Sequence, residues 1–391
     1  MLETSTAPEG TSHQETTIGY RWSRVFRERW ASMTSVDLAV FSTGWLLGWL
    51  LLWRTRPLPS FPPPAREPLA VIVPARNEAR SIGNVVDRIV AQMRPGDEFV
   101  VVDDASDDGT AVIARGRGAR VVTTSPAPGW LGKPHACWRG AAATAGPTLL
   151  FIDADVLPST HLLDDIDAVA RAHPDMVVSV QPWHRTERWY EQASLLCNVA
   201  ALMGSGAFTV LGERVHPTVA FGPVLAMRRV RYEGVGGHEA VRDRHTEDIG
   251  LARLAGGAVL FTGRPDTTFR MYPDGWRQLL DGWTRTIVAG FRSTRWWVAL
   301  GVVWWIAALA GGWLAGGLPV HDPLRAGLVY LSCAVQCWVL GRRAGSIHPL
   351  TAALFPLAVA VFVLVVVRGF AVAALHRDVI WKGRRVDARS G

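Results

Sequence analysis

The chain has 391 residues, of which 49% are hydrophobic and 19% charged, and its formal net charge is +7. This length suffices for one sizeable domain with further segments, and the apolar content is high for a wholly soluble protein. A basic balance suits nucleic acid, anionic lipid or an anionic substrate, but the sequence has no zinc-knuckle, basic-helix or aromatic-basic RNA motif, so we expect no nucleic-acid partner.

The N-terminal part of the chain predicts a tail, a membrane anchor and a stiff linker. Residues 1–35 form a flexible basic tail, whose segment 20–30 is either a helix on an anionic membrane surface or a solvated positive arm. Residues 36–53 are apolar after Asp37 and fall within the range of about 17–25 residues that a membrane-spanning helix takes, so we expect a transmembrane anchor. Residues 54–68 contain six prolines and predict a semi-rigid spacer.

The next part of the chain alternates short apolar runs with segments of helical length. The runs predict strands at Leu69–Val73, Glu98–Asp103, Arg120–Thr123, Thr148–Asp153 and Met176–Gln181. The segments between them predict helices at Glu78–Met93, Gly109–Arg115, Pro134–Ala145 and His161–Ala172. This alternation favours an α/β domain, residues 69–292, with a parallel sheet and helices on its faces.

The fourth strand ends in two carboxylates, Asp153 and Asp155, which an extended chain would point in the same direction. Ligands of parallel sheets bind at the carboxyl ends of the strands. Two hard oxygen ligands at this place suit a Mg²⁺ or Mn²⁺ that also holds a substrate diphosphate. An isolated pair of this kind would be read as an Asp-rich turn, and the motifs on either side of it favour the metal.

Three more motifs stand at predicted strand or helix ends. Pro74-Ala75-Arg76-Asn77-Glu78 breaks the first strand, and Asp103-Asp104 ends the second, where acids can accept hydrogen bonds from a base or a ribose. By themselves these acids favour an ordinary Asp-rich turn that caps the next helix. Lys133, in a Gly-Pro loop before a helix, suits a diphosphate or is simply solvated.

The segment Thr246-Glu247-Asp248 supplies a candidate base. Thr246 is expected to cap a short helix, whose positive end would keep the two acids ionised, as a base requires. Upstream, His238 is open to two interpretations. It is either a contact to donor phosphate, metal or acceptor, or an ordinary loop histidine. Downstream, Arg270-Met271-Tyr272-Pro273 and Gly282-Trp283-Thr284-Arg285 enclose a segment, 276–291, with the composition of a helix at a lipid interface.

The remaining apolar segments concern the membrane. We reject 195–211 as a span, because it would place Asp155 and Glu247 on opposite sides of the bilayer. Residues 293–376 predict about three spanning helices, and residues 377–391 a basic tail. The spanning candidates are Trp296–Leu318, Leu324–Leu340 and Leu350–Leu375, the last interrupted by Pro356 and Arg368. The four cysteines show neither metal-site nor disulfide spacing.

Taken together and in order, these motifs resemble the family 2 glycosyltransferases, which have a GT-A, Rossmann-like fold. The resemblance covers roughly residues 69–291 and implies an inverting transfer of a sugar from a nucleotide sugar, with UDP as the usual carrier. It also implies roles for single residues. These are Pro74, Ala75, Glu78, Asp103 and Asp104 for the nucleoside, Lys133 beside the phosphates, Asp153 and Asp155 as the DXD motif for metal and diphosphate, Asp248 as base and Glu247 beside it.

A finer comparison concerns the acceptor. Processive polysaccharide synthases of this superfamily carry Q-x-x-R-W, whereas this chain has Gln278-Leu279-Leu280-Asp281-Gly282-Trp283. Its Gly-Trp-Thr-Arg pattern is more similar to membrane glycosyltransferases of carotenoid-acid and hopanoid pathways, with His238 and Trp283 as acceptor-side candidates. The sequence thus predicts a hexosyltransferase of the cytoplasmic membrane, multi-pass and facing the cytoplasm, that adds one sugar to a lipid-soluble terpenoid or carotenoid acid or alcohol. The alternatives are a processive synthase, a polyprenyl-phosphate sugar transferase and a non-catalytic membrane scaffold.

Overall fold

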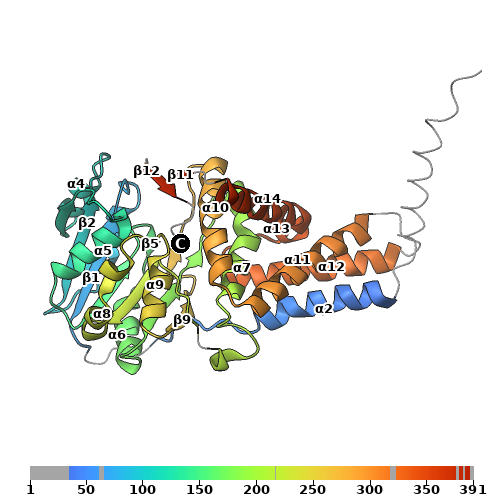
Figure 1. The fold of residues 1–391 in the computed structure, drawn as a ribbon, viewed down its shortest axis with the longest axis horizontal. Coiled ribbons are helices and arrows are strands. Elements are labelled where there is room, and N and C mark those ends of the chain that lie inside the picture. The colour runs from blue at the N-terminus through green and yellow to red at the C-terminus, as the bar shows by residue number, and fades with distance from the viewer. Residues whose placement is uncertain are drawn as a thin grey trace, which may run out of the picture.

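The structure, a computed structural model, describes residues 35–60, 66–215, 217–317, 323–375, 378–381 and 384–387. Figure 1 shows two parts, a sheet domain with helices on its faces and an arm of long helices at one side of it. The expected tail 1–35 lies outside the described residues apart from its last residue, and so does the proline-rich stretch 61–65.

A seven-stranded sheet in the order β3-β2-β1-β4-β8-β6-β9 forms the centre of the domain. All neighbouring strands are parallel except β8, which runs antiparallel to both β4 and β6, so the predicted parallel sheet is confirmed with one reversed strand. The strands are β1 (Leu69–Ala75), β2 (Glu98–Asp104), β3 (Arg120–Thr124), β4 (Thr148–Ile152), β6 (Val177–Gln181), β8 (Val224–Arg228) and β9 (Ala258–Thr262).

The helices of this domain follow the strands closely in sequence. They are α3 (Ile82–Val90), α4 (Thr110–Gly116), α5 (Gly132–Ala142), α6 (Leu162–Ala172), α7 (Leu195–Gly204), α8 (Arg229–Gly234) and α9 (Glu247–Leu254). A small sheet joins β5 (Val156–Leu157), β10 (Thr268–Phe269) and β7 (Trp183–His184), and β11 (Asp378–Trp381) pairs with β12 (Arg384–Asp387) where a tail was expected. With ten residues, α7 is too short to span a membrane, in agreement with the rejection of segment 195–211.

Two apolar cores hold helices against the two faces of the large sheet. On one face, α5 approaches β1 closely at Gly140, where a Cβ atom would lie 2.4 Å from Ile72 Cγ2. On the other face, the strands pack against α3 and α6, through Ile82 and Ile166 among others. Because the strands are buried on both faces, they read as unbroken apolar runs, and the polar residues that follow them gather at the carboxyl edge of the sheet.

The arm consists of α2 (Ser35–Leu51), α11 (Trp296–Gly317), α12 (Pro323–Ala344), α13 (Pro349–Ala353) and α14 (Phe355–Ala374), and α10 (Trp276–Ser293) lies between it and the sheet domain (Figure 1). Within the described residues, α12 and α14 are long and apolar enough to cross a membrane, whereas the apolar segments Leu38–Leu51 and Trp296–Gly311 are shorter. The sequence predicted an anchor and about three further spans, whereas two helices of the described residues are long and apolar enough to span.

Polar contacts explain two details of the arm. Trp305 Nε1 donates to Gln336 Oε1 at 2.9 Å, and Gln336 Nε2 donates to the Trp45 carbonyl at 2.7 Å, which joins α11, α12 and α2. Arg368 of α14 forms an ion pair with Asp281 of α10, so this arginine faces protein.

The segment expected at 350–375 is two helices, because the chain breaks at Leu354, before Pro356.

The described end of the proline-rich linker does not stand off as a spacer. The Leu58 N–H donates to the Thr262 carbonyl at 3.0 Å, and the Thr262 N–H donates to the Arg56 carbonyl at 2.8 Å. Prolines are compatible with this position because β9 is the edge strand of the sheet, where one side of the ladder is open.

Candidate active site

The carboxyl ends of β1 and β2 bring the first two motifs together. Ala75, which follows Pro74, stands opposite Asp103 in the strand register. Asp103 and Asp104 are both 4% exposed, and Asp103 Oδ1 has no hydrogen-bond partner among the described residues. A buried, unsatisfied carboxylate oxygen at this edge is an acceptor that a bound ligand can satisfy.

The two loops that follow these strands hold each other in place. The Asn77 N–H donates to Ser106 Oγ at 3.0 Å, and the Asp107 N–H donates back to Asn77 Oδ1 at 3.1 Å. Asn77 and Ala105 have φ angles of 53° and 52°, a strained backbone of the kind that clusters at ligand sites. The Glu78 carboxylate accepts from Ser81 Oγ at 3.0 Å, at the start of α3.

The next part of the site is an ion cluster around Lys133, which lies in the first turn of α5. Its Nζ atom is 2.8 Å from Asp153 Oδ1 and 3.0 Å from Glu247 Oε1, and it donates to the Gly222 carbonyl at 3.4 Å. Burial by itself would lower the pKa of Lys133, but the two carboxylates raise it well above its usual value. The structure therefore joins the end of β4 to the start of α9 through a fixed positive charge.

Asp248 lies beside this cluster, in the first turn of α9, and accepts the Ile249 N–H at 2.9 Å. Gly222 makes room for it, since a Cβ there would lie 3.2 Å from both Asp248 Oδ2 and Lys133 Nζ. Burial and then the charge of Glu247 raise the pKa of Asp248 to about 7, while Lys133 lowers it. A carboxylate with such a pKa can exchange a proton near neutral pH.

This result differs from the expected helix-end stabilisation of an ionised carboxylate. Thr246 precedes α9 but makes no capping hydrogen bond through its side chain. Burial raises the pKa of Asp248 more than the positive end of the helix lowers it. The reason is that burial excludes the water that would solvate the ionised carboxylate.

The described residues contain no group of three or more His, Cys, Asp or Glu side chains that could hold a metal. Asp153 and Asp155 do fit a Mg²⁺ or Mn²⁺ bound together with a diphosphate, because such ions are commonly held by one or two carboxylates and substrate phosphates. The Asp153 side chain is 28% exposed, so an ion can reach it.

The comparisons with known proteins identify the family of the chain. Residues 70–222 match the model of the family described as Glycosyl transferase family 2. The 4,4'-diaponeurosporenoate glycosyltransferase of Staphylococcus aureus strain MRSA252 is 32% identical over 332 residues, covering 81% of this chain and 88% of that protein. The chain belongs to glycosyltransferase family 2.

Two further comparisons agree with this assignment. The protein of the same name from strain USA300 is 31% identical over the same shares of both chains. A solved structure, a mannosyltransferase of Pyrobaculum calidifontis in complex with GDP-Man and Mn²⁺, covers 82% of this chain and 96% of its own at 23% identity and a TM-score of 0.50. The glycosyltransferase thus has the predicted GT-A fold.

Two residues of the downstream motifs, to which the sequence analysis gave no role, lie close enough to the acids of the cluster to feel their charge, one in α10 and one in the loop before it. Arg285 is close enough to Glu247 and Asp153 for their charges to oppose the lowering of its pKa by burial. Tyr272 is buried, which raises its pKa, and Arg285 and Asp155 act on it with opposite signs. The sequence signal for both was the pair of motifs around Met271 and Gly282, which pointed to Trp283 instead.

The two acceptor-side candidates lie in the core rather than on a wall open to an acceptor. Trp283 is 3% exposed and donates to Ser194 Oγ at 3.0 Å. His238 is 2% exposed, its Nδ1 is 3.0 Å from the Tyr232 hydroxyl, and burial followed by the charge of Lys133 lowers its pKa to about 3. This imidazole is therefore enclosed and neutral, and the Tyr232 hydroxyl also accepts the His238 backbone N–H at 3.1 Å.

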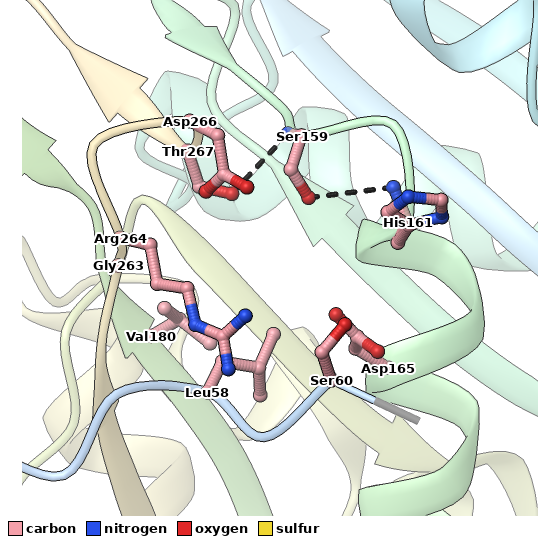
Figure 2. A pocket seen from close by; sticks show the side chains of 10 residues that line it. All are labelled: Leu58, Ser60, Ser159, His161, Asp165, Val180, Gly263, Arg264, Asp266 and Thr267. Atoms are coloured by element: carbon pink, nitrogen blue, oxygen red, sulfur yellow. Dashed lines mark hydrogen bonds between the residues drawn. The ribbon is translucent and has the colours of Figure 1, made fainter. Parts of the chain in front are cut away.

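The small pocket in Figure 2 is separate from the enzyme's site and is too small for a substrate. It has a volume of about 20 Å³, which is room for a water molecule. Ser159 lies at its edge, between Thr267 and His161; its N–H donates to Thr267 Oγ1 at 3.2 Å and its Oγ accepts the His161 N–H at 3.4 Å (Figure 2).

Gly282 should be essential for the position of Tyr272. Tyr272 has a φ of 56°, and its ring lies so close to α10 that a Cβ at Gly282 would come 2.1 Å from Tyr272 Cε1. We expect G282A to displace the ring and lower kcat/KM on the order of 100-fold, as a shift of about 1 Å in a site can. The matched control is G290A in the same helix, where nothing lies within 4 Å.

A double variant tests whether Tyr272 carries that effect. If it does, adding G282A to Y272A should cost no further activity, because the displaced ring is already absent. Thermal unfolding of each variant shows whether the chain is still folded. An equal loss in G290A, or fully additive losses in the double variant, would contradict the explanation.

Proposed function

We propose that this glycosyltransferase moves a single hexose, with inversion, from a nucleotide sugar, a UDP-sugar in our proposal, to a lipid-soluble carotenoid or terpenoid acid or alcohol. The observation that carries the proposal is the cluster in which Lys133 bridges Asp153 and Glu247 with Asp248 beside it, at the carboxyl edge of the sheet. In one place this cluster offers positive charge for a leaving diphosphate and a carboxylate for an acceptor.

The donor side follows from the ends of β1, β2 and β4. We propose that Pro74, Ala75 and Glu78 line the nucleoside and that Asp103 and Asp104 accept hydrogen bonds from it, for which Asp103 Oδ1 is available. A Mg²⁺ or Mn²⁺ held by Asp153 and Asp155 would stabilise the charge that develops on the diphosphate as the sugar leaves. Lys133 and Arg285 add positive charge, since both lie close enough to Asp153 and Glu247 to interact with them.

The acceptor side of the proposal follows from the two acids at the start of α9. Asp248 is proposed to take the proton of an acceptor hydroxyl, and Glu247 holds Lys133 beside it. Attack from the face opposite the leaving diphosphate inverts the configuration of the sugar.

The lipid acceptor is supported by two independent features. The relatives from S. aureus are named for a carotenoid carboxylate. In addition, α10, whose Arg285 feels the charges of Glu247 and Asp153, lies between the sheet domain and the apolar arm. We place α12 and α14 in the cytoplasmic membrane as spans, with α2 and α11 beside them. The sheet domain then faces the cytoplasm, where nucleotide sugars are found. Arg343 of α12 agrees with this, since it donates to the Trp53 carbonyl at the domain end of the arm.

The test is metal-dependent release of nucleoside diphosphate by the purified enzyme in detergent. UDP- and GDP-sugars are screened with and without a total lipid extract, and mass spectrometry of the lipids counts the sugars added. We expect release from a UDP-sugar that needs both the lipid and the metal, and a product with one sugar. Many sugars would indicate a processive synthase, and a phosphate in the linkage a polyprenyl-phosphate acceptor. No release with any donor would leave the non-catalytic scaffold.

A further inference from the structure

A second hollow of the molecule lies at the base of α2, away from the Lys133 cluster. Its volume is about 630 Å³, within the range of about 300–1,000 Å³ that is typical of small-molecule sites. It is lined by Trp53, Arg54, Thr55, Arg56, Pro57, Ala207, Thr209, Val210 and Gly212.

Backbone hydrogen bonds fix both walls of this cleft. On one wall, the Arg54 N–H donates to the Phe208 carbonyl at 3.3 Å, and the Val210 N–H donates to the Leu50 carbonyl at 2.8 Å. On the other, the Arg56 carbonyl accepts from Thr262 of β9 at 2.8 Å. This cleft is therefore preorganised, and it is formed by the end of α2, the loop after α7 and the edge of the large sheet.

The chemistry of the lining is that of an anionic amphiphile. Arg54 and Arg56 supply positive charge, while Trp53 and Val210 are 55% and 51% exposed and supply apolar surface beside it. The carbonyls at the end of α2 would repel an anion. Arg343 donates to the Leu52 and Trp53 carbonyls and so removes much of that repulsion.

The position of the cleft selects one source for the ligand. Its lining residues lie at the end of α2, which Figure 1 shows where the arm meets the sheet domain, and Arg343 of α12 donates to the Trp53 carbonyl there. If the arm is in the membrane, as in the function proposed above, this junction is at the level of the lipid headgroups. Exposed tryptophan is enriched at that level, and each arginine there favours anionic lipid.

We propose that the cleft binds the headgroup of an anionic phospholipid, with its phosphate between Arg54 and Arg56 and the start of an acyl chain along Trp53 and Val210. The inference rests on the proposed membrane association and adds a lipid site distinct from the acceptor site. It involves no residue of the Lys133 cluster, so sugar transfer can be measured separately.

The test uses the full chain, reconstituted in nanodiscs of phosphatidylcholine with a fraction of phosphatidylglycerol and then measured by native mass spectrometry for retained lipid. We expect one phosphatidylglycerol molecule to be retained in preference to phosphatidylcholine. The double variant R54Q/R56Q should weaken this retention on the order of 10- to 30-fold, which is what two arginine contacts contribute. W53A should weaken it as well, through the apolar wall.

The matched control is R88Q/R115Q, which removes the same charge from exposed positions on α3 and α4 of the sheet domain, and Figure 1 shows α4 at the end of this domain farthest from the arm. Equal loss in both double variants would overturn the site, as would equal retention of the two lipids. Displacement by inorganic phosphate at low concentration would identify free phosphate as the ligand and also overturn it. The same samples are also tested for release of nucleoside diphosphate, which shows whether the proposed sugar transfer occurs. Whether the protein inserts into nanodiscs of neutral lipid alone shows whether the proposed membrane association holds.

Discussion

Replacing Asp153 with asparagine should reduce kcat/KM for sugar transfer on the order of 10²–10³-fold, the loss that follows removal of one fixed electrostatic group from an active site. The shape of the side chain is kept, but the negative charge that holds Lys133 at 2.8 Å is lost. On our proposal the metal that binds the diphosphate loses a charged ligand at the same time. The loss should appear chiefly in kcat/KM for the nucleotide-sugar donor, measured at limiting donor concentration.

Two further measurements make the Asp153 prediction specific. Calorimetric binding of UDP should require Mg²⁺ or Mn²⁺ in the wild type, and D153N should need a higher metal concentration for the same affinity. The control D87N removes an exposed carboxylate, which pairs with Arg117 on the outer surface, and should change activity little. Equal metal requirements in D153N and the wild type would remove Asp153 from the proposed metal site.

The sheet and its polar edge could be predicted because both depend on local sequence. A strand buried on both faces must be an apolar run, and the first polar residue after it marks the strand end. For this reason the expected ends at Asp103 and Asp153 differ from the observed strands by one residue. The reversed direction of β8 could not be read in this way, since an apolar strand looks the same in either direction.

The contacts within the site could not be predicted, because they depend on side chains brought together by the fold. Lys133 meets Asp153 and Glu247 from separate elements, and sequence motifs give no distance between them. The raised pKa of Asp248 likewise depends on burial, which outweighs the field of the helix end. Tyr272 and Gly282 stand in the two downstream motifs, but those motifs do not show that the Tyr272 ring packs directly on the Gly282 backbone.

The effect of replacing Asp248 with asparagine should depend on the acceptor. An alcohol must lose its proton during transfer, and general base catalysis of that step contributes typically about 10²–10⁴-fold. A carboxylic acid has a pKa near 4, so at neutral pH it is already an anion and needs no base. We therefore expect D248N to lose about 10²–10⁴-fold with an alcohol acceptor and less than about tenfold with an acid.

The pH dependence gives an independent view of the same residue. Because the pKa of Asp248 is raised to about 7 by burial and by Glu247, its base form predominates above that pH, and Lys133 and Asp153 also face it. With an alcohol acceptor, kcat/KM should rise with pH and level off above about 7, and D248N should lack this rise. With an acid acceptor, the wild type should show no such rise, since the acceptor is ionised throughout.

Both acceptor classes can be compared on one polyene skeleton, as an acid and as the corresponding alcohol. The two substrates share the apolar part, so a difference between them reports on the proton alone. A large loss in D248N with both would mean that Asp248 positions the acceptor or Lys133 rather than accepting a proton. Little loss with either would assign the base elsewhere, and Glu247, 3.0 Å from Lys133, would be the next carboxylate to replace.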